Sequence, residues 1–247
     1  MDSFLVVLAF GIAAALGDIL GGLILTANAK RWWEPALLRY FLALSVGFML
    51  AVAVLEMVPE SMKLTSQAPL FVLLGYLLVH FFEHILASHF HFGEETHTEA
   101  MVGASVGHMA FLGLAVHSFF DGVSIASGFA VSHALGLLVF SAVMLHKVPE
   151  GFTISSIMLA AGASRGRALG SATAIGLATI LGVLFLSLVS ALVPYALALS
   201  AGAILYVAAS DLMPEVNKEV GPAMALLVVA GVVLFYLAES VLHWFGL

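Results

Sequence analysis

The segments HSFFDG at His117–Gly122 and HKVPEG at His146–Gly151 decide the fold of this chain, because each places ionisable side chains inside a long apolar run. In each segment a histidine precedes a carboxylate by four residues, so on a helix the two side chains lie on one face, one turn apart. Ionisable groups inside a membrane span are costly, and their presence there indicates a function. The two segments therefore predict two helices that face each other and together supply four metal ligands.

The composition requires a membrane setting for these segments. Of the 247 residues, 62% are hydrophobic and 9% are charged, which excludes a water-soluble globular domain of this length. The chain has no cysteine, so disulfides and thiolate-bound metals are excluded. The net charge of −7 comes largely from carboxylates within or beside the spans, and no basic patch indicates nucleic-acid binding. No basic segment precedes the first apolar run, so we expect a retained span and not a cleaved signal peptide.

Eight apolar runs, separated by polar, proline and glycine breaks, are each long enough to cross a bilayer. They lie near 3–28, 36–58, 69–90, 102–130, 134–161, 168–193, 195–213 and 222–245. Basic residues gather in the loops of one side, with Lys63 alone on the other. The residues on the basic side are Lys30, Arg31, Arg39, Arg165, Arg167 and Lys218. The positive-inside rule then places both termini outside, and we expect an all-α, polytopic protein of the plasma (inner) membrane of a prokaryote, with one transmembrane domain over 1–247.

The fourth and fifth runs are joined around Ser132 by a turn so short that their helices must be antiparallel neighbours. His117 lies 15 residues before Ser132 and His146 lies 14 after it, so both histidines stand roughly 20 Å from the turn, near the middle of the bilayer. Asp121 and Glu150 follow by one turn on their helices, and the four side chains converge on one cation. Two imidazoles and two carboxylates suit Zn²⁺, while Fe²⁺, Mn²⁺ and Cd²⁺ stay open.

Proline and glycine support this site. Pro149 inside a helix frees the carbonyl of Leu145, which is tolerable at membrane depth only where it faces protein or a wet cavity. Gly122 and Gly151 allow helices to approach closely. The alternative is that each of these residues is ordinary in a membrane helix, and that an intramembrane histidine is a packed hydrogen-bonding residue. Asp18, flanked by glycines in the first run, either lines a path or bonds across a close helix contact.

The same acid-x-x-Pro-Glu string ends the second run at Glu56–Glu60 and the seventh run at Asp211–Glu215. The two runs cross the membrane in opposite senses, as in an inverted repeat of helices 1–3 and 6–8 around the 4–5 hairpin, a 3+2+3 arrangement of eight transmembrane helices. Such repeats are typical of transporters. Glu56 and Glu60 would attract cations at the outer mouth, and Asp211 and Glu215 would guide them out at the inner one. The alternative is that Pro-Glu only ends a helix at the interface.

The motifs H-x-x-x-[ED]-G and H-x-x-P-E-G resemble the paired signatures of the ZIP (Zrt/Irt-like) divalent metal transporters, and the resemblance covers nearly the whole chain. It implies import of Zn²⁺ or a related metal toward the cytoplasm, with the metal as transported substrate and no prosthetic group. It also implies a homodimer. By the same resemblance the ligands are His117, Asp121, His146 and Glu150, with Met49 as a weak thioether ligand.

The chain departs from the family pattern at three positions. Many members have asparagine after the first histidine and asparagine or aspartate after the second, where this chain has Ser118 and Lys147. The family string G-L-x-E-P-L-G corresponds to Gly176–Gly182, in which the acidic ligand has become Thr179. All three changes remove ligands of a second ion, so we hypothesise a single-metal site in which the Lys147 ammonium replaces that ion. The alternative is that Lys147 snorkels or pairs with Asp211 or another distant acid.

A histidine-containing loop at 91–101, on the predicted cytoplasmic side, and the end of the third run before it carry further candidate metal ligands. These are His84, His89, His91 and His97. The alternative is a solvated polar linker.

Two other functions stay open beside transport by alternating access around a midplane site. An intramembrane hydrolase would use a bound Zn²⁺ to activate water, but it needs an open coordination position, and the chain has no H-E-x-x-H and no serine nucleophile motif. A passive metal channel would differ only in whether both mouths open together. We expect a transporter and not an enzyme.

Overall fold

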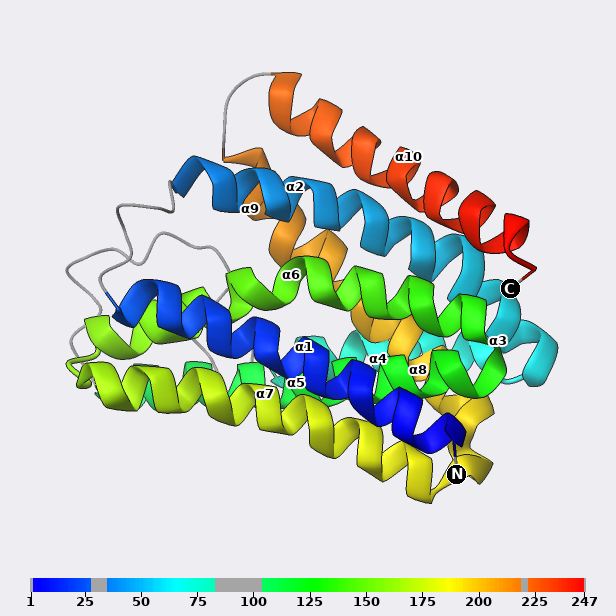
Figure 1. Cartoon of the computed structure of the whole chain (residues 1–247), viewed down its shortest axis with the longest axis horizontal. Coiled ribbons are helices and arrows are strands. Elements are labelled where there is room, and N and C mark those ends of the chain that lie inside the picture. Colours follow the sequence, from blue (N-terminus) through cyan, green and yellow to red (C-terminus); the bar gives the residue numbers. More distant parts are fainter. Residues whose placement is uncertain (1, 28–34, 83–103, 219–221, 247) are drawn as a thin grey trace.

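The computed structural model describes residues 2–27, 35–82, 104–218 and 222–246. Its long helices cross the molecule from end to end, and no strand occurs among these residues (Figure 1). The α-helices are α1 (Asp2–Thr26), α2 (Pro35–Ala51), α3 (Val58–Leu64), α4 (Ala68–Phe81), α5 (Ala104–Val131), α6 (His133–Ala160), α7 (Arg165–Leu188), α8 (Val193–Tyr206), α9 (Met213–Asn217) and α10 (Pro222–Trp244). Shorter elements are the π-helices η2 (Val52–Met57) and η5 (Val207–Leu212) and the 3-10 turn η4 (Ser190–Leu192).

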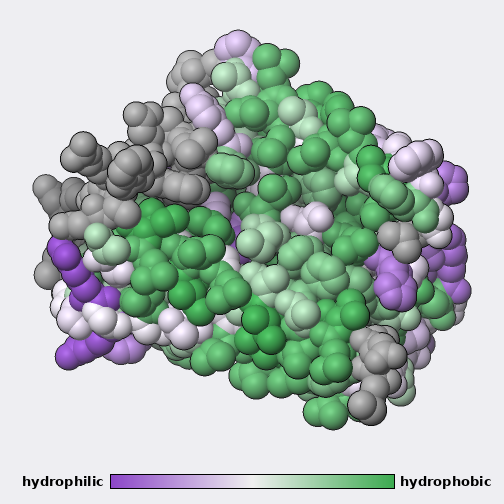
Figure 2. All heavy atoms as spheres, viewed as in Figure 1, coloured by the Kyte–Doolittle hydropathy of each residue, from purple (hydrophilic) through white to green (hydrophobic). Residues whose placement is uncertain are grey.

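The surface of the molecule is that of a membrane protein. Seven helical stretches in the described chain are long and apolar enough to cross a bilayer, and the apolar helix α4 is shorter, with 14 residues. Figure 2 shows hydrophobic side chains over the middle of the molecule and hydrophilic ones toward its two ends. Large apolar side chains such as Leu16, Leu181 and Leu226 are exposed on this surface. An apolar surface of this extent suits lipid and not water, so the chain is an integral, multi-pass membrane protein.

Successive long helices alternate in direction, and both chain termini lie at the same end of the molecule (Figure 1). The starts of α2 and α7 and the end of α9 lie toward the opposite end. These segments carry Arg39, Arg165, Arg167 and Lys218, whereas Lys63 belongs to α3, beside the termini. Basic residues of the described chain therefore gather at one end.

Serine caps fix the starts of two central helices. Ser132 alone separates α5 from α6, and its side chain accepts a hydrogen bond from the Leu135 N–H at 3.1 Å. Ser164 accepts one from the Arg167 N–H at 3.4 Å and begins α7. Gly162, in the turn before it, has a φ of +84°, which glycine adopts without steric cost. Helices α5 and α6 are thus the antiparallel neighbours that the short turn predicts.

Two span ends differ from the sequence-based expectation. We expected the second and seventh spans to end near residues 58 and 213, but helix continues as α3 to Leu64 and as α9 to Asn217. Helix α7 begins and ends a few residues earlier than expected, at Arg165–Leu188. The third span is described only as far as Phe82.

A π-helix explains why the helix continues through Pro59. A proline lacks an N–H, and its ring crowds the carbonyl four residues back, so it usually breaks an α-helix. Immediately before Pro59 the N–H of Val58 bonds to the carbonyl of Ala53, five residues back. This widened turn shifts the hydrogen bonding by one residue and admits the proline. The helix η5 does the same before Pro214.

The most extensive helix contacts divide the spans into two sets. One set comprises α1, α5, α6 and α7, and the other comprises α2, α4, α8 and α10. In Figure 1, α2 and α10 lie on one side of α6, and α1 lies on the other. A core of buried apolar side chains that includes Met49, Val139 and Ile204 joins the two sets.

Glycines make the closest approaches within each set. A Cβ at Gly151 on α6 would overlap the carbonyl oxygen of Asp18 on α1. A Cβ at Gly122 on α5 would likewise overlap the carbonyl oxygen of Thr179 on α7. The pairs α2–α10 and α4–α8 also meet over glycines. Because any side chain at these points would push two backbones apart, glycine is what lets the helices meet there.

Candidate metal centre

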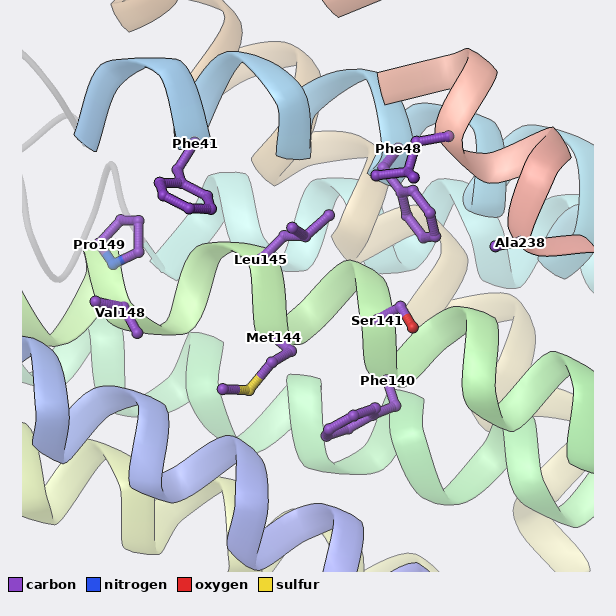
Figure 3. A pocket seen from close by; sticks show the side chains of 10 residues that line it. Phe41, Phe48, Phe140, Ser141, Met144, Leu145, Val148, Pro149 and Ala238 are labelled. Carbon is purple, nitrogen blue, oxygen red and sulfur yellow. The ribbon is translucent and has the colours of Figure 1, made fainter. Parts of the chain in front are cut away.

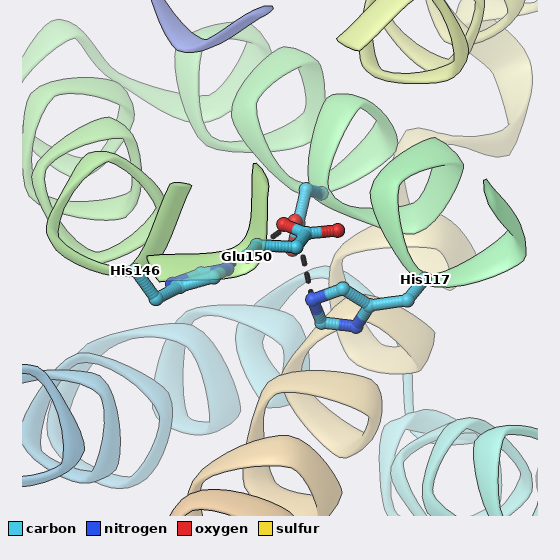
Figure 4. Close-up of side chains that lie close together, drawn as sticks. His117, His146 and Glu150 are labelled. Carbon is cyan, nitrogen blue, oxygen red and sulfur yellow. Dashed lines mark hydrogen bonds and ion pairs between the residues drawn. The ribbon is translucent and has the colours of Figure 1, made fainter. Parts of the chain in front are cut away.

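Four predicted ligands meet between α5 and α6. His117 and Asp121 lie one turn apart on α5, and His146 and Glu150 lie one turn apart on α6. One ligand atom from each residue lies within 4.8 Å of the other three. Figure 4 shows the two imidazoles on either side of Glu150. Sequence spacing had predicted that these four side chains converge.

The separations within the group suit a tetrahedral ion. The Nε2 atoms of His117 and His146 lie 3.4 Å and 3.3 Å from the same oxygen, Oδ2 of Asp121. Ligands bound tetrahedrally to Zn²⁺ at about 2.0–2.1 Å are about 3.3–3.4 Å from one another. These two separations therefore match those of a tetrahedral ligand set, and all four ligand atoms lie within 4.8 Å of one another.

The orientation of His146 also favours a cation. Its Nδ1 lies 3.0 Å from the carbonyl oxygen of Ala142, which can only accept a hydrogen bond, so Nδ1 carries the proton. In the neutral ring this leaves the Nε2 lone pair directed at the Asp121 carboxylate. Two electron-rich atoms that face each other repel unless a cation lies between them. This arrangement suits a metal ligand whose tautomer is fixed by the backbone.

Lys147 lies beside the four ligands, fully buried. Its Nζ lies 2.7 Å from Oε2 of Glu150 and 2.9 Å from Oδ2 of Asp121. A third carboxylate, that of Asp18 on α1, lies 3.4 Å away. The lysine does not snorkel to an interface, and the ion pairs that the structure gives it are with these three acids and not with Asp211.

Ser118 connects the lysine to the ligands. Its hydroxyl donates to Oε1 of Glu150 at 2.5 Å and accepts from Nζ of Lys147 at 3.1 Å. Both oxygens of Glu150 are thus held by neighbours, and each keeps a lone pair for a metal ion. The serine therefore orients Glu150, a predicted ligand, without contributing a ligand atom of its own.

Thr179 stands on α7 where the family pattern has an acidic ligand. The residue is fully buried, and its hydroxyl has no hydrogen-bond partner among the described residues. It brings no charge to the centre. With Ser118 and Lys147 it completes the three departures from the family pattern.

The centre is closed on most sides. Side-chain exposure is 12% for His117, 4% for His146, 3% for Asp121 and zero for Glu150. An ion at this point is therefore removed from bulk solvent, where charge–charge interactions are strong. His117 is the most accessible of the four.

Pro149 lies inside α6, beside the ligand Glu150, and lines an apolar crevice of about 490 Å³ (Figure 3). Phe41 and Phe48 of α2 face Leu145 and Pro149 of α6 across it. The two helix sets are thus incompletely packed next to the centre. This crevice is apolar, and no histidine or carboxylate of the described chain lines it.

The other predicted residues occupy various places. Met49 is fully buried in the apolar core, so the structure agrees with a packing role, and its role as a ligand stays a prediction. Glu56 lies in η2 and Asp211 in η5, at matching points of the two π-helices. Glu60 and Glu215 each pair with the lysine three residues later, at 2.5 Å and 2.9 Å. Their roles along a path also stay predictions.

The candidate ligands of the loop lie outside the described residues. They are His84, His89, His91 and His97. Nearby in the described chain, the exposed His80 of α4 has its Nδ1 3.4 Å from the Tyr206 hydroxyl of α8.

Sequence reasoning did not identify Asp18 as a partner of Lys147. Asp18 had two open interpretations, a path and a close helix contact, and the structure shows the contact. Gly17 meets the Lys147 Cβ, and Gly151 meets the Asp18 backbone, so the two charged side chains are adjacent. The signal in the sequence was an acid between glycines in one span and a lysine in the middle of another.

Comparisons with known proteins point to one family. The family model for the ZIP zinc transporters matches residues 93–238. The chain is 34% identical over 160 residues to the zinc transporter ZIP9 of Xenopus tropicalis, and the match covers 59% of this chain and 52% of that protein. It is 29% identical over 147 residues to the zinc transporter SLC39A7 of Rattus norvegicus, with 54% of this chain and 31% of that protein covered. The matches thus span about half or less of these relatives.

Proposed function

Since this chain belongs to the ZIP zinc transporter family, we propose that it carries a divalent metal cation, Zn²⁺ first of all, across the membrane. The observation that supports this most is the group of four ligand atoms within 4.8 Å of one another on two adjacent spans. Two imidazoles and two carboxylates suit Zn²⁺, and they also accept Cd²⁺, Fe²⁺ and Mn²⁺. The names of both relatives specify zinc.

Eight crossings form the proposed scaffold. Seven stretches qualify by length, and the shorter apolar helix α4 (Ala68–Phe81) is the eighth. Both termini lie at one end of the molecule, which requires an even number of crossings (Figure 1). The gathering of basic residues at the other end supports a cytoplasmic orientation of that end and termini outside.

An inverted repeat of the first three and last three spans accounts for the helix pairing. It relates α1 to α7, α2 to α8 and α4 to α10, and it exchanges the two hairpin helices. The pairs α1–α6 and α5–α7 then become equivalent, as do α2–α10 and α4–α8, and these pairs meet over glycines in the same manner. The π-helix and proline in the second span recur in the seventh. The repeat supports a transporter because such sites form where repeats meet.

The centre holds one transported ion, and Lys147 takes the place of a second. Its ammonium contacts a carboxylate from each ligand helix, at 2.9 Å and 2.7 Å. A second metal ion there would stand next to a fixed positive charge, which is strongly unfavourable inside a protein. Ser118 and Thr179 offer neutral hydroxyls and no charge to offset it.

The ion moves inward by alternating access. The set with the centre (α1, α5, α6, α7) shifts against the other set, and the apolar crevice beside Pro149 lies where the two sets are incompletely packed. Glu60 stands at the outer end and Glu215 at the inner end of the proposed path. The relatives are eukaryotic, so they carry no support for the expected prokaryotic inner membrane.

A hydrolase is disfavoured by the ligand set. Such an enzyme keeps one coordination position for water. Here four side chains already offer ligand atoms within 4.8 Å of one another, and Lys147 and Ser118 occupy the space beside the carboxylates. Transport is the better use of this geometry.

The test is Zn²⁺ uptake into proteoliposomes by the wild-type chain and by His146→Ala. Saturable uptake that the substitution abolishes supports the proposal. Ser141→Ala, on the same helix but in the apolar crevice, is the matched control and should retain uptake. Equal uptake by wild type and His146→Ala would remove the centre from the path. Flux that does not saturate would indicate a channel.

A further inference from the structure

Asp18 is a buried carboxylate that the ligand set does not use. It lies in the middle of α1 with zero exposure, and its two oxygens have no hydrogen-bond partner in the described part of the chain. An ionised or polar group buried in this way is costly. The charged group that forms an ion pair with it is Lys147, at 3.4 Å, which is near enough for attraction but longer than a good charge-assisted hydrogen bond.

The backbone around Asp18 is built to bring it to this lysine. Gly17 lets α1 approach the Lys147 Cβ, where an added Cβ would come within 2.8 Å. One residue later, the Asp18 backbone packs directly on Gly151, next to the ligand Glu150. A carboxylate is therefore directed at the centre from a third helix, at a point where two glycines allow the closest approach.

Counting formal charges gives Asp18 a role. With a metal bound by Asp121 and Glu150, the divalent ion and the Lys147 ammonium bring three positive charges. The two ligand carboxylates supply two negative charges, and the Asp18 carboxylate supplies the third. Without it the buried group would carry an excess positive charge, which a low-dielectric interior penalises heavily.

Binding of the ion also requires somewhere for the ammonium to go. Oδ2 of Asp121 is shared by both imidazoles and by Lys147. An ion that takes this oxygen repels the ammonium at close range. A displacement of about 0.6 Å toward Asp18 would turn the 3.4 Å contact into a charge-assisted hydrogen bond of about 2.8 Å.

We propose that Asp18 is a positioning residue for the metal centre, which receives the Lys147 ammonium when a divalent ion binds and so balances the charge of a one-ion site. The inference rests on the proposed metal transport and assigns a carboxylate outside the ligand set to it. Asp18 acts through Lys147 and does not touch the ion.

The test is a double-mutant cycle on Zn²⁺ affinity in detergent, with a competing chelator as the reporter. The variants are Asp18→Asn, Lys147→Met and the double substitution. Zn²⁺ binding that is lost in Asp121→Ala is counted as binding at the centre. Ser155→Ala, an uncharged change where α6 meets Gly22 of α1, is the matched control.

Asp18→Asn should lower the site affinity about 10- to 100-fold, as changes behind a metal ligand commonly do. The double variant should recover most of it, because two carboxylates and one divalent ion are balanced again. The control should bind as the wild type does. Equal affinity in wild type and Asp18→Asn, or a loss that Lys147→Met does not relieve, would overturn the proposal and leave Asp18 as a packing residue.

Thermal unfolding of the same proteins supplies a second readout. Without metal, Asp18→Asn should unfold no earlier than wild type, and added Zn²⁺ should raise its unfolding temperature less. If Asp18→Asn alone fails to fold, the proposal is tested by comparing the unfolding temperatures of Lys147→Met and the double variant without metal. The double variant should unfold at the higher temperature, and the reverse order overturns the proposal. Absence of site-specific Zn²⁺ binding in the wild type would instead refute metal transport itself.

Discussion

The seam between α1 and α6 and the seam between α5 and α7 have the same packing and different chemistry. In the first, Gly151 meets the carbonyl of Asp18, and in the second, Gly122 meets the carbonyl of Thr179. The glycines follow the two site carboxylates directly in the sequence. The backbones therefore meet in the same way on both sides of the centre, whereas an acid on one side corresponds to a neutral hydroxyl on the other.

The same contrast recurs one position after each histidine. Lys147 on α6 carries a buried ammonium, and Ser118 on α5 carries a hydroxyl. The α1–α6 side, called the charged half below, thus holds the acid Asp18 and the base Lys147. The α5–α7 side, called the neutral half, holds the hydroxyls of Thr179 and Ser118. The glycine contacts thus give both halves the same helix geometry, and under the proposed function the side chains beside them set the number of ions.

Asp121 joins the two halves, so its removal breaks the comparison most severely. Its Oδ2 contacts Lys147 on the charged half and both imidazoles. Asp121→Ala should reduce Zn²⁺ uptake by at least about 100-fold, since it deletes a ligand and the acceptor shared by three cationic or metal-binding groups. Uptake into proteoliposomes measures this, with folding checked by gel filtration. Retained uptake would mean that Asp121 is not a ligand.

The charged half should depend on its side chain far more than the neutral half does. Lys147→Met leaves three buried carboxylates without their ammonium and should lower the free energy of unfolding by about 3–5 kcal/mol. Ser118→Ala removes one hydrogen bond to Glu150 and should cost about 1 kcal/mol. Chemical unfolding in detergent without metal measures both, and Lys63→Met at the exposed end of α3 should have no measurable effect. Equal losses at 118 and 147 would contradict the asymmetry.

By contrast, a methyl group added at the glycine contact should lower the stability equally on the two sides. Gly151→Ala and Gly122→Ala each force a methyl group into an opposing backbone and should each cost about 1–3 kcal/mol of stability. Gly170→Ala on α7 is the control, because an added Cβ there meets nothing within 4 Å. That substitution should be neutral or stabilising by about 0.5–1 kcal/mol. If only one seam responds, the two are not equivalent.

The smallest change is expected at Thr179. Its hydroxyl is buried without a hydrogen-bond partner in the described chain, so Thr179→Val should be neutral or stabilising by up to about 1 kcal/mol. Zn²⁺ affinity should not change, because the threonine brings no charge. A large loss of affinity would show that the hydroxyl takes part in metal binding, and the α5–α7 side would then contribute to the metal centre.

The spacing of ionisable residues made much of the centre predictable. Histidine and acid four residues apart define a helix face, and the single-residue turn at Ser132 forces α5 and α6 together at matching depth. The family resemblance is confirmed by the family match. These features depend on local geometry, which sequence patterns carry well.

What sequence could not supply depends on contacts between distant segments. The pairing of Asp18 with Lys147 requires the register of α1 against α6, which glycines permit but do not specify. Helix ends near Pro59 and Pro214 were placed too early, because a proline normally stops a helix and the π-helix before each one removes the conflict. Both misses lie beside acids assigned to the centre or its path.

The claim that one divalent ion binds beside the Lys147 ammonium is tested most directly by a crystal structure of the Zn²⁺-loaded chain with an anomalous difference map at the zinc edge. We expect one peak at the centre, within about 2.0–2.1 Å of the His117 and His146 nitrogens and of an oxygen from Asp121 and from Glu150. Lys147 should show no peak at its Nζ position. Two peaks flanking the carboxylates, with the lysine displaced from both, would contradict it.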